Sequence, residues 1–201
     1  MNISLVSYGL GNLGSVVNMG KRAGAKVTLV STPDEVLASE RVILPGVGAF
    51  DEGMDRLQSR GLVEALREFA ASGRPLLGIC LGMQLLLDGS EEGTSPGLGL
   101  VPGNSVRFSE SAGVRVPHMG WNTVEPTRAD PLVEGLPDDS RFYFVHSYRV
   151  VPNREEDQLA TTNYGGPFAS MIRADNVVGA QFHPEKSHAF GMTILKNFAA
   201  A

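Results

Sequence analysis

The chain has 201 residues, of which 42% are hydrophobic and 19% charged, a composition that can bury a sizeable core and excludes a disordered chain. Its formal net charge is −5 and its lysines and arginines form no cluster, which argues against a nucleic-acid-binding protein. The single cysteine excludes an internal disulfide and a cysteine-based zinc site, and leaves a thiol that is either buried or used.

Two stretches of the sequence bear on where the protein resides. No basic residue precedes Lys21, so the charged leader of a secretory signal is missing and we expect a cytoplasmic protein. The most apolar stretch, residues 75–87, contains Gln84 and is shorter than the roughly 18 apolar residues that a membrane span needs. We therefore expect no membrane segment and interpret this stretch as part of the core.

The first half of the sequence alternates short aliphatic runs with segments of helical periodicity, which is typical of a parallel sheet with crossover helices. Asn12 is a plausible helix cap and Gly24 a plausible helix end. Strands are expected at residues 3–7, 26–30, 41–44 and 76–79. Helices are expected at residues 12–24, from Thr32-Pro33 onward, between 50 and 71 as one helix or as two separated near Gly61, and from residue 81.

The second half differs in kind. Residues 88–103 have the composition of a loop, and residues 110–113 match no pattern. Short strands are expected at residues 105–108, 114–116, 121–124, 142–148, 159–163, 169–173 and 177–182, before a helix at 190–200. We expect these strands to belong to the same sheet. Residues 1–201 are thus predicted to form one α/β domain with a mixed, mostly parallel open central sheet flanked by helices and an antiparallel extension in its C-terminal half.

The segment Gly9-Leu10-Gly11-Asn12-Leu13-Gly14 fits the G-x-G-x-x-G pattern of a dinucleotide-binding turn, because it follows a strand and opens a helix. The pattern lacks the acidic residue that should close the second strand, since Val30 is followed by Ser31 and Thr32. A dinucleotide-binding oxidoreductase therefore stays a weak rival to a plain glycine-rich turn.

The cysteine lies in Gly78-Ile79-Cys80-Leu81-Gly82, where an aliphatic strand turns into a helix, as in a nucleophile elbow. Glycines on both sides allow a sharp turn in which side chains would collide with neighbouring backbone. A sulfur at a helix N-terminus is favoured as thiolate, and the Leu81 amide can face a developing oxyanion. The alternative is a merely buried thiol.

A cysteine nucleophile needs a base, and His183 is the most distinctive of the four histidines. It leaves an apolar strand directly into Pro184 and Glu185, and extended backbone before proline would project His183 and Glu185 to the same side. Glu185 could then orient the imidazole. His118 and His146 lie in apolar strands and are interpreted as core residues. No metal-site spacing occurs, so we expect no metal.

A further turn, LPGVGAF at residues 44–50, follows the third predicted strand. The glycines around Val47 allow a backbone N–H to face a ligand at the carboxyl edge of the sheet, where ligands of open α/β sheets bind. The alternative is an ordinary strand-to-helix turn.

GICLGMQLL (78–86) and QFHPEKS (181–187) together resemble the class I glutamine amidotransferases, whose glutaminase domain uses a Cys-His-Glu triad. The resemblance narrows to the glutaminase subunits of imidazole glycerol phosphate synthase, a histidine-biosynthesis enzyme, and covers essentially the whole chain. It rests on PGVGAF (45–50), VPHMGWN (116–122), YFVHSY (143–148) and FHPEKSHAFG (182–191), in this order and at these spacings.

The resemblance implies a nucleophile, a general base and acid, and an orienting carboxylate: Cys80, His183 and Glu185. It implies an oxyanion hole from the backbone at Val47 and Leu81, for which the Gly46–Val47 peptide would flip. Glutamine would be held by Gly46, Gly48, Gln84, Glu92, Ser147 and Tyr148.

The resemblance also implies a partner, a (β/α)8-barrel cyclase that forms a heterodimer with this chain and receives the ammonia. The residues expected at or near that contact are Asn12, Met119, Trp121, Tyr143 and Lys186. No cofactor is implied. The rivals that stay open are a glutaminase subunit of another amidotransferase pathway, a cysteine-triad protease or other hydrolase on a related fold, and the dinucleotide-binding oxidoreductase.

Overall fold

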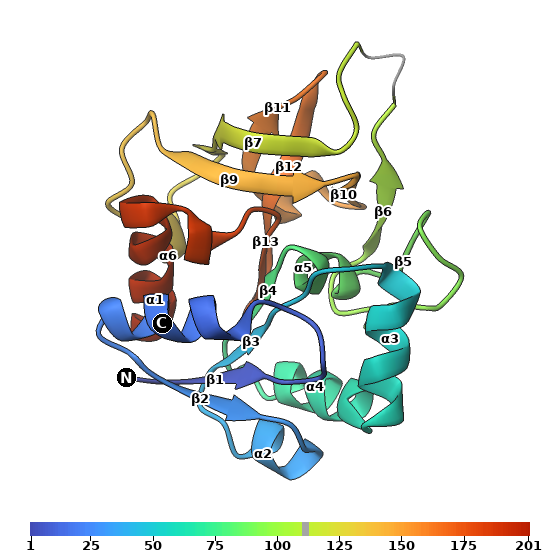
Figure 1. The fold of residues 1–201 in the computed structure, drawn as a ribbon, viewed down its shortest axis with the longest axis vertical. Helices are drawn as coiled ribbons and strands as arrows, with labels where there is room; N and C mark the ends of the chain where they lie inside the picture. Colours follow the sequence, from blue (N-terminus) through green and yellow to red (C-terminus); the bar gives the residue numbers. More distant parts are fainter. Residues whose placement is uncertain (110–112) are drawn as a thin grey trace.

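The structure, a computed structural model, describes residues 1–109 and 113–201, and its main sheet is parallel on one side and mostly antiparallel on the other (Figure 1). The parallel strands, in spatial order, are β2 (Lys26–Val30), β1 (Asn2–Val6), β3 (Val42–Leu44), β4 (Leu76–Ile79) and β13 (Val177–Ala180). The sheet continues through β12 (Pro167–Ala174), β10 (Tyr148–Pro152), β6 (Gly103–Arg107) and β5 (Gly89–Ser90), with β11 (Gln158–Asn163) and β8 (Glu125–Pro126) joined beside β12. The predicted mixed α/β sheet is therefore confirmed.

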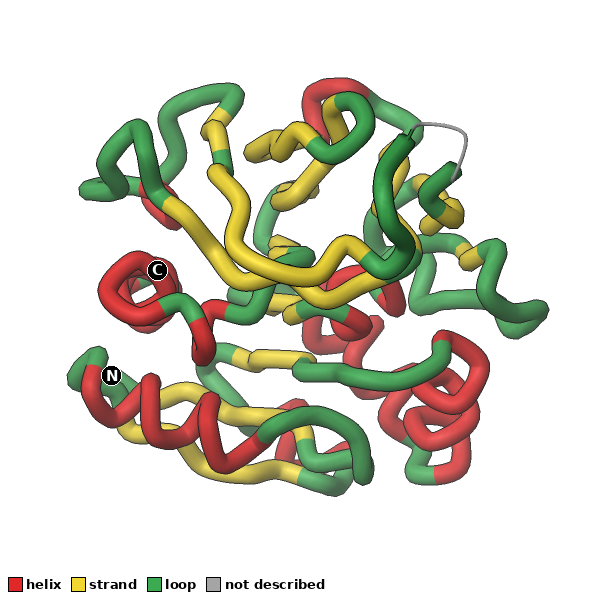
Figure 2. The backbone as a smooth tube through the Cα atoms, turned by 45° about the horizontal axis from the view of Figure 1, so that its top comes forward, coloured by secondary structure: helices red, strands yellow, loops and turns green. Residues whose placement is uncertain are grey.

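Helices cover both faces of the parallel part of the sheet (Figure 2). One layer contains α1 (Leu13–Arg22) and α6 (His188–Ala200), and the other contains α2 (Pro33–Leu37), α3 (Phe50–Ser59), α4 (Leu62–Ala71) and α5 (Leu81–Leu85). Three short 3₁₀ turns, η2 (Pro131–Val133), η3 (Glu155–Asp157) and η4 (Pro184–Lys186), complete the helical elements of the described residues. Alternate residues of β1 enter the two cores: Ile3 and Leu5 pack towards α1 and α6, and Val6 packs towards α3 and α4.

Local signals in the sequence set several element boundaries. The Asn12 side chain accepts a hydrogen bond from the Ser15 amide and caps α1, and Gly24, just beyond its end, has a φ of +84°. Thr32 and Glu35 form a reciprocal capping box at α2. Gly61, with a φ of +68°, separates α3 from α4. Of the two alternatives left open for residues 50–71, the structure therefore has two helices separated near Gly61.

The predictions for the second half were wrong at several places, the first of which is the loop expected at residues 88–103, because it contains β5. The predicted strand at 114–116 is not a strand, since Pro117 beyond it has no N–H to donate to a neighbour. The strand predicted at 142–148 is two strands, β9 (Arg141–His146) and β10, and the strand predicted at 177–182 ends at Ala180. β9 pairs with β7 (His118–Thr123) as a separate two-stranded sheet, so these two strands are not part of the antiparallel extension.

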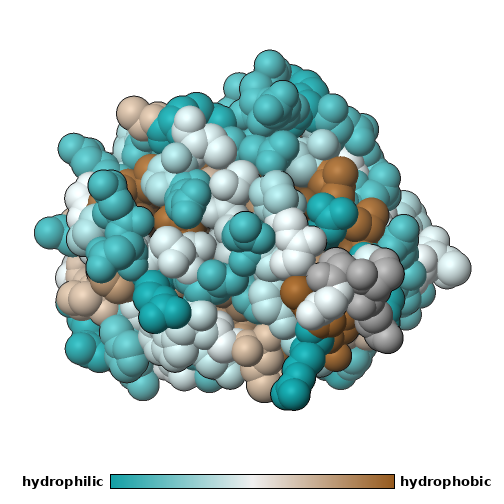
Figure 3. Space-filling view, turned by 90° about the horizontal axis from the view of Figure 1, so that it is seen from above, coloured by the Kyte–Doolittle hydropathy of each residue, from teal (hydrophilic) through white to brown (hydrophobic). Residues whose placement is uncertain are grey.

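Hydrophobic side chains gather mainly inside the two cores. The face seen from above is mostly hydrophilic or intermediate, with hydrophobic side chains confined to separate spots (Figure 3). Within the described residues, every helix falls short of the length and apolar character needed to span a bilayer.

Candidate active site

Cys80 occupies a strained turn between β4 and α5. Its φ and ψ are 56° and −111°, a conformation that non-glycine residues rarely adopt, and its amide donates to the Ala180 carbonyl at 2.8 Å. A β-carbon on Gly78 would lie 2.6 Å from the Gly82 carbonyl oxygen, and one on Gly82 would collide with the Leu44 carbonyl. The glycines are therefore needed for close backbone packing, and the turn holds the sulfur at the start of α5.

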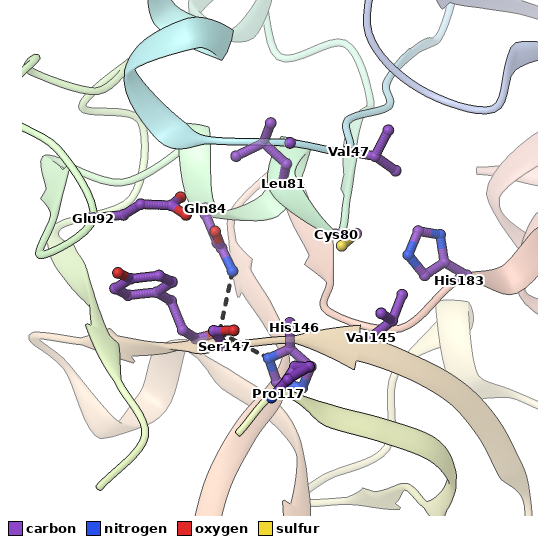
Figure 4. Close-up of a pocket in the computed structure, with 12 residues that line it drawn as sticks. Val47, Cys80, Leu81, Gln84, Glu92, Pro117, Val145, His146, Ser147 and His183 are labelled. Atoms are coloured by element: carbon purple, nitrogen blue, oxygen red, sulfur yellow. Dashed lines mark hydrogen bonds between the residues drawn. The ribbon is translucent and has the colours of Figure 1, made fainter. Parts of the chain in front are cut away.

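His183 lies three residues beyond the end of β13, beside the Cys80 sulfur (Figure 4). Its Nδ1 donates to Glu185 Oε1 at 2.8 Å, and the side chains of both residues are 2% exposed. Its Nε2 is buried and has no hydrogen-bond partner within normal distance limits among the described residues. The structure thus brings together the three residues that the sequence singled out. The His183 Nδ1 is bonded to the Glu185 carboxylate, and its Nε2 is available for proton transfer.

The electrostatics favour a charged imidazole. Burial alone would lower the pKa of His183, but its contacts with Cys80 and Glu185 outweigh burial and raise this pKa above its usual value. A protonated His183 next to Cys80 stabilises a thiolate. The backbone argument from the sequence was wrong, however: Pro184–Lys186 forms a 3₁₀ turn, so Glu185 reaches the imidazole from a turn and not from an extended strand.

A cavity of about 330 Å³ opens beside Cys80 and His183 (Figure 4). Its size suits a small molecule. Apart from the cysteine and the histidine, the lining consists of Val47, Gly48, Leu81, Gln84, Glu92, Pro117, Val145, His146, Ser147 and Tyr148. All but one of the residues expected at the oxyanion hole or around glutamine are in this lining.

The exception is Gly46, which lies behind the wall of the cavity. A β-carbon on Gly46 would be 2.8 Å from the Leu81 β-carbon and 2.8 Å from the Tyr8 hydroxyl. Tyr8, fully buried, donates to the Pro45 carbonyl at 2.7 Å, and burial, followed by the charge of Cys80, raises the pKa of its hydroxyl. The turn at Val47 is therefore fixed by buried contacts with Tyr8 and Leu81.

Two polar side chains of the lining are fixed by the protein itself. Glu92 Oε2 accepts from the Phe50 amide at the start of α3 at 2.9 Å, and its pKa is raised, mainly by burial. Gln84 Nε2 donates to the Tyr148 carbonyl at 3.1 Å and to Gln181 Oε1 at 3.2 Å. A carboxylate and an amide therefore stand at defined positions opposite the sulfur.

The residues expected at a partner contact lie outside this cavity: Asn12, Met119, Trp121, Tyr143 and Lys186. Met119 and Trp121 alternate with inward residues along β7 and are 62% and 42% exposed. The Lys186 ammonium lies 5.5 Å from the centre of the Tyr143 ring, and Trp121 packs edge-on against that ring. Asn12 is exposed at the start of α1, the helix that packs beside Lys186 and the rest of η4.

The glycine-rich turn at residues 9–14 has packing contacts of its own. The Arg56 guanidinium donates to the Gly9 carbonyl at 3.2 Å, and a β-carbon on Gly11 would lie 3.1 Å from the Pro45 ring. Gly9 and Gly11 both have positive φ. These contacts favour a structural turn that allows the segment after β3, which contains Pro45, to pass close by.

Sequence reasoning assigned no role to Gln181 and Tyr8, and placed His146 in the core only. Gln181 is fully buried, and its Nε2 lies 3.9 Å from the Cys80 sulfur. Its position between an apolar strand and the His183-Pro184 pair was the available signal. His146 is buried as predicted but also lines the cavity.

Comparisons with known proteins indicate the family of the chain. The model of the family "Glutamine amidotransferase class-I" matches residues 4–201. Imidazole glycerol phosphate synthase subunit HisH 2 of Pseudomonas aeruginosa is 50% identical over 197 residues, 98% of this chain and 98% of that protein. Subunit HisH of Moorella thermoacetica is 51% identical over 197 residues, 98% of this chain and 93% of that protein.

Solved structures agree on the fold. The structure of PurLQS from Thermotoga maritima superposes with a TM-score of 0.77 at 19% identity, covering 98% of this chain and 96% of that one. A glutamine amidotransferase crystal structure gives a TM-score of 0.72 at 21% identity and covers 99% of both chains. From the family model and the high identity over nearly full length, the chain belongs to the class I glutamine amidotransferases and, within them, to the glutaminase subunits of imidazole glycerol phosphate synthase.

Proposed function

We propose that this chain, acting as one glutaminase domain in the cytoplasm, hydrolyses glutamine to glutamate and ammonia through a thioester on Cys80. The observation that carries this proposal is the juxtaposition of Cys80, His183 and Glu185 at one wall of a cavity of about 330 Å³. A thiol on a strained turn, a histidine and a buried carboxylate that orients it are the parts that nucleophilic catalysis needs.

In the first step the Cys80 thiolate attacks the side-chain carboxamide carbon of glutamine. The oxyanion receives hydrogen bonds from the backbone N–H groups of Val47 and Leu81, after the Gly46–Val47 peptide has turned inward. Protonated His183 donates its proton to the departing nitrogen, so the carbon–nitrogen bond breaks and a γ-glutamyl thioester and ammonia are formed. Neutral His183 then takes a proton from water, which attacks the thioester and releases glutamate.

The remaining polar groups of the cavity suit the amino-acid end of glutamine. Glu92 supplies a carboxylate for the α-ammonium group, and Gln84, Ser147 and Tyr148 supply amide, hydroxyl and backbone groups. Gly48 leaves room for the substrate beside Val47, and Gly46 contributes through its peptide rather than as a wall of the cavity.

The ammonia goes to a partner, because free ammonia would be protonated and lost in water. We propose that this partner is a (β/α)8-barrel cyclase in a heterodimer with the chain, consistent with relatives that are subunits of imidazole glycerol phosphate synthase. The cyclase would join the nitrogen to a phosphoribulosyl formimino carboxamide ribonucleotide and form imidazole glycerol phosphate and an aminoimidazole carboxamide ribonucleotide.

The test measures glutamate release from glutamine by the chain alone and with the cyclase subunit, empty or loaded with its nucleotide. We expect slow release by the chain alone and stimulation by the loaded partner, because an oxyanion hole that must reorganise is idle until then. Equal rates of glutamine hydrolysis with and without the loaded partner would contradict the proposed stimulation by the cyclase. Peptide cleavage in place of glutamate release would contradict the reaction itself.

A further inference from the structure

Two histidines that the proposed reaction does not use are buried beside the cavity. His118 on β7 and His146 on β9 are directly opposite each other in the antiparallel pair, and they are 3% and 6% exposed. His146 lines the cavity, whereas His118 lies behind it. If these imidazoles served only as packing in the core, their ring nitrogens would have no hydrogen-bond partners. Burying such unpaired polar atoms would lower the free energy of unfolding substantially.

These rings instead form an unbroken chain of hydrogen bonds. His146 Nδ1 is 2.7 Å from the Tyr148 carbonyl oxygen, and His146 Nε2 is 3.0 Å from His118 Nδ1. His118 Nε2 is 3.3 Å from Asn122 Nδ2. The chain runs from the cavity wall to strand β7, and all four ring nitrogens take part in it.

The direction of every bond follows from chemistry. Burial lowers the pKa of His118 to about 4 and that of His146 to about 3, so both rings are neutral at neutral pH. Because a carbonyl only accepts, His146 carries its proton on Nδ1 and accepts at Nε2 from His118 Nδ1. His118 Nε2 then accepts from the Asn122 amide. One tautomer of each ring satisfies every partner.

Aromatic side chains fix the orientation of the pair. The His118 ring is stacked on Phe144 at 4.7 Å and on Tyr164 at 3.9 Å between centroids. Phe168 meets His118 at 5.9 Å and His146 at 5.4 Å. With its faces covered, His118 cannot rotate without loss of packing, so its Nδ1 is held towards His146.

The end of the chain, the Tyr148 carbonyl, is part of the glutamine site. It accepts from His146 Nδ1 on one side and from Gln84 Nε2 on the other, and Figure 4 shows both bonds as dashed lines. Ser147 and Tyr148 lie where the backbone leaves β9 for β10. The Ser147 carbonyl accepts from the Phe108 amide at 3.0 Å, and Tyr148 pairs with Arg107 of β6. The Tyr148 carbonyl, in contrast, is held by the side chains of His146 and Gln84.

We propose that His146 and, through it, His118 are positioning residues that hold the Ser147–Tyr148 segment in the conformation that binds glutamine. The inference rests on the proposed function, because it assigns the pair to the glutamine site. Neither ring contacts the reacting atoms. Loss of the pair should therefore weaken glutamine binding more than it slows the chemical steps.

Three variants and one control test the proposal in the complex with the nucleotide-loaded cyclase. His118→Phe keeps the stacking but removes the donor to His146, and His146→Gln removes the donor to Tyr148. Each should raise KM for glutamine about fivefold, the effect of one hydrogen bond, with kcat nearly unchanged. His146→Asn keeps an N–H at the Nδ1 position and should stay close to the wild-type KM.

The control is Phe198→Leu on α6, which removes packing from the same hydrophobic cluster but leaves the ring contacts and the hydrogen bonds of the two histidines in place. It should lower Tm and leave KM unchanged. A wild-type KM in His118→Phe, or an equal rise of KM in Phe198→Leu, would overturn the proposal. A wild-type complex that releases no glutamate would instead overturn the proposed function.

A direct readout does not depend on activity. In ¹⁵N-histidine NMR of the wild-type chain, both His118 and His146 should be Nδ1–H tautomers. Detection of His146 in the Nε2–H form would contradict the hydrogen-bond chain.

Discussion

At the scale of single residues, the candidate site depends on the charge of the His183 imidazole, which is buried between Cys80 and Glu185. The His183 and Glu185 side chains are each 2% exposed, so water cannot replace the carboxylate if it is lost. Glu185 Oε2 is buried without a hydrogen bond to the described residues, which leaves Oε1 and the imidazole as the main stabilising contact of the carboxylate. The protonation state of His183 should therefore be set largely by Glu185 and Cys80.

Replacement of Glu185 by glutamine tests this dependence. Glu185→Gln removes a contact that raises the pKa of His183, so this pKa should fall and less imidazolium should be present at neutral pH. We expect kcat for glutamine hydrolysis to drop about 10²- to 10⁴-fold, as for a lost triad carboxylate. Steady-state kinetics over a range of pH would measure both effects. Glu64→Gln, in an exposed ion pair with Arg67, is the matched control and should behave like wild type.

The buried histidine pair gives the protein a pH-dependent stability. The folded pKa values of His118 and His146, about 4 and about 3, lie below the roughly 6.5 of an unfolded histidine. Their contribution is complete above about pH 6.5 and is lost as the pH falls from there towards the folded pKa values, because in this range the unfolded state takes up protons that the folded state does not. Between pH 7 and 5 we expect a loss of up to about 2 kcal/mol per ring.

Urea unfolding of wild type and His118→Phe at the two pH values isolates one ring's share. The variant should lose less free energy of unfolding on acidification than the wild type does. An identical pH dependence of the two proteins would contradict the depressed pKa of His118.

The residues that the sequence could identify are those with a local signature. Cys80 lies between two glycines and His183 precedes proline, so both positions can be read from neighbouring residues. Tyr8 has no such signature, because its role arises from a contact with Pro45, far away in the sequence. Gln181 has only its position after an apolar strand as a signal, because its contact with Cys80 is equally distant in the sequence. The predicted contact between Glu185 and His183 is present in the structure. A 3₁₀ turn makes this contact possible, whereas extended backbone was predicted.

At the scale of elements, the turn from β4 to α5 is tightly constrained by backbone packing. Gly82 packs its α-carbon against the Leu44 carbonyl, with no room for a β-carbon. Because backbone rather than a flexible side chain would have to move, Gly82→Ala should cost about 3 kcal/mol or more of unfolding free energy and most of the activity. Chemical denaturation would measure the loss.

Gly14 provides the control for this substitution. It lies in the first turn of α1 with open space where a β-carbon would be, so Gly14→Ala should stabilise the protein by about 0.5–1 kcal/mol. If Gly82→Ala were as stable as wild type, the close packing at the elbow would be refuted.

The boundaries of an element could be predicted where residues of the same segment determine them. They were harder to predict where the pairing of distant strands determines them. Caps and glycine breaks placed α1, α2, α3 and α4 nearly correctly. The alternating pattern of residues 142–148 reads as one strand, yet β9 pairs with β7 and β10 pairs with β6. That change of partner after His146 depends on segments more than 20 residues away in sequence, which no local pattern encodes.

At the scale of the whole molecule, the exposed part of β7 is the surface most suited to the proposed partner. Met119 and Trp121 are among the few large hydrophobic side chains that are exposed in the described structure. Trp121→Ala should weaken binding to the cyclase subunit about tenfold or more, as expected for a central aromatic residue of an interface. Calorimetric titration would measure the affinity, and Leu29→Ala, on the distant edge strand β2, should leave it unchanged. Equal affinities of wild type and Trp121→Ala would exclude this face.

The net charge of −5 excludes no partner enzyme. The proposed reaction is tested most directly at the Cys80 sulfur. The most direct measurement compares glutamine-dependent with ammonia-dependent synthesis by the complex carrying Cys80→Ala. We expect glutamine-dependent synthesis to be abolished and ammonia-dependent synthesis to keep its wild-type rate, because only the thioester step requires the thiol. Undiminished glutamine hydrolysis by the variant would contradict the mechanism.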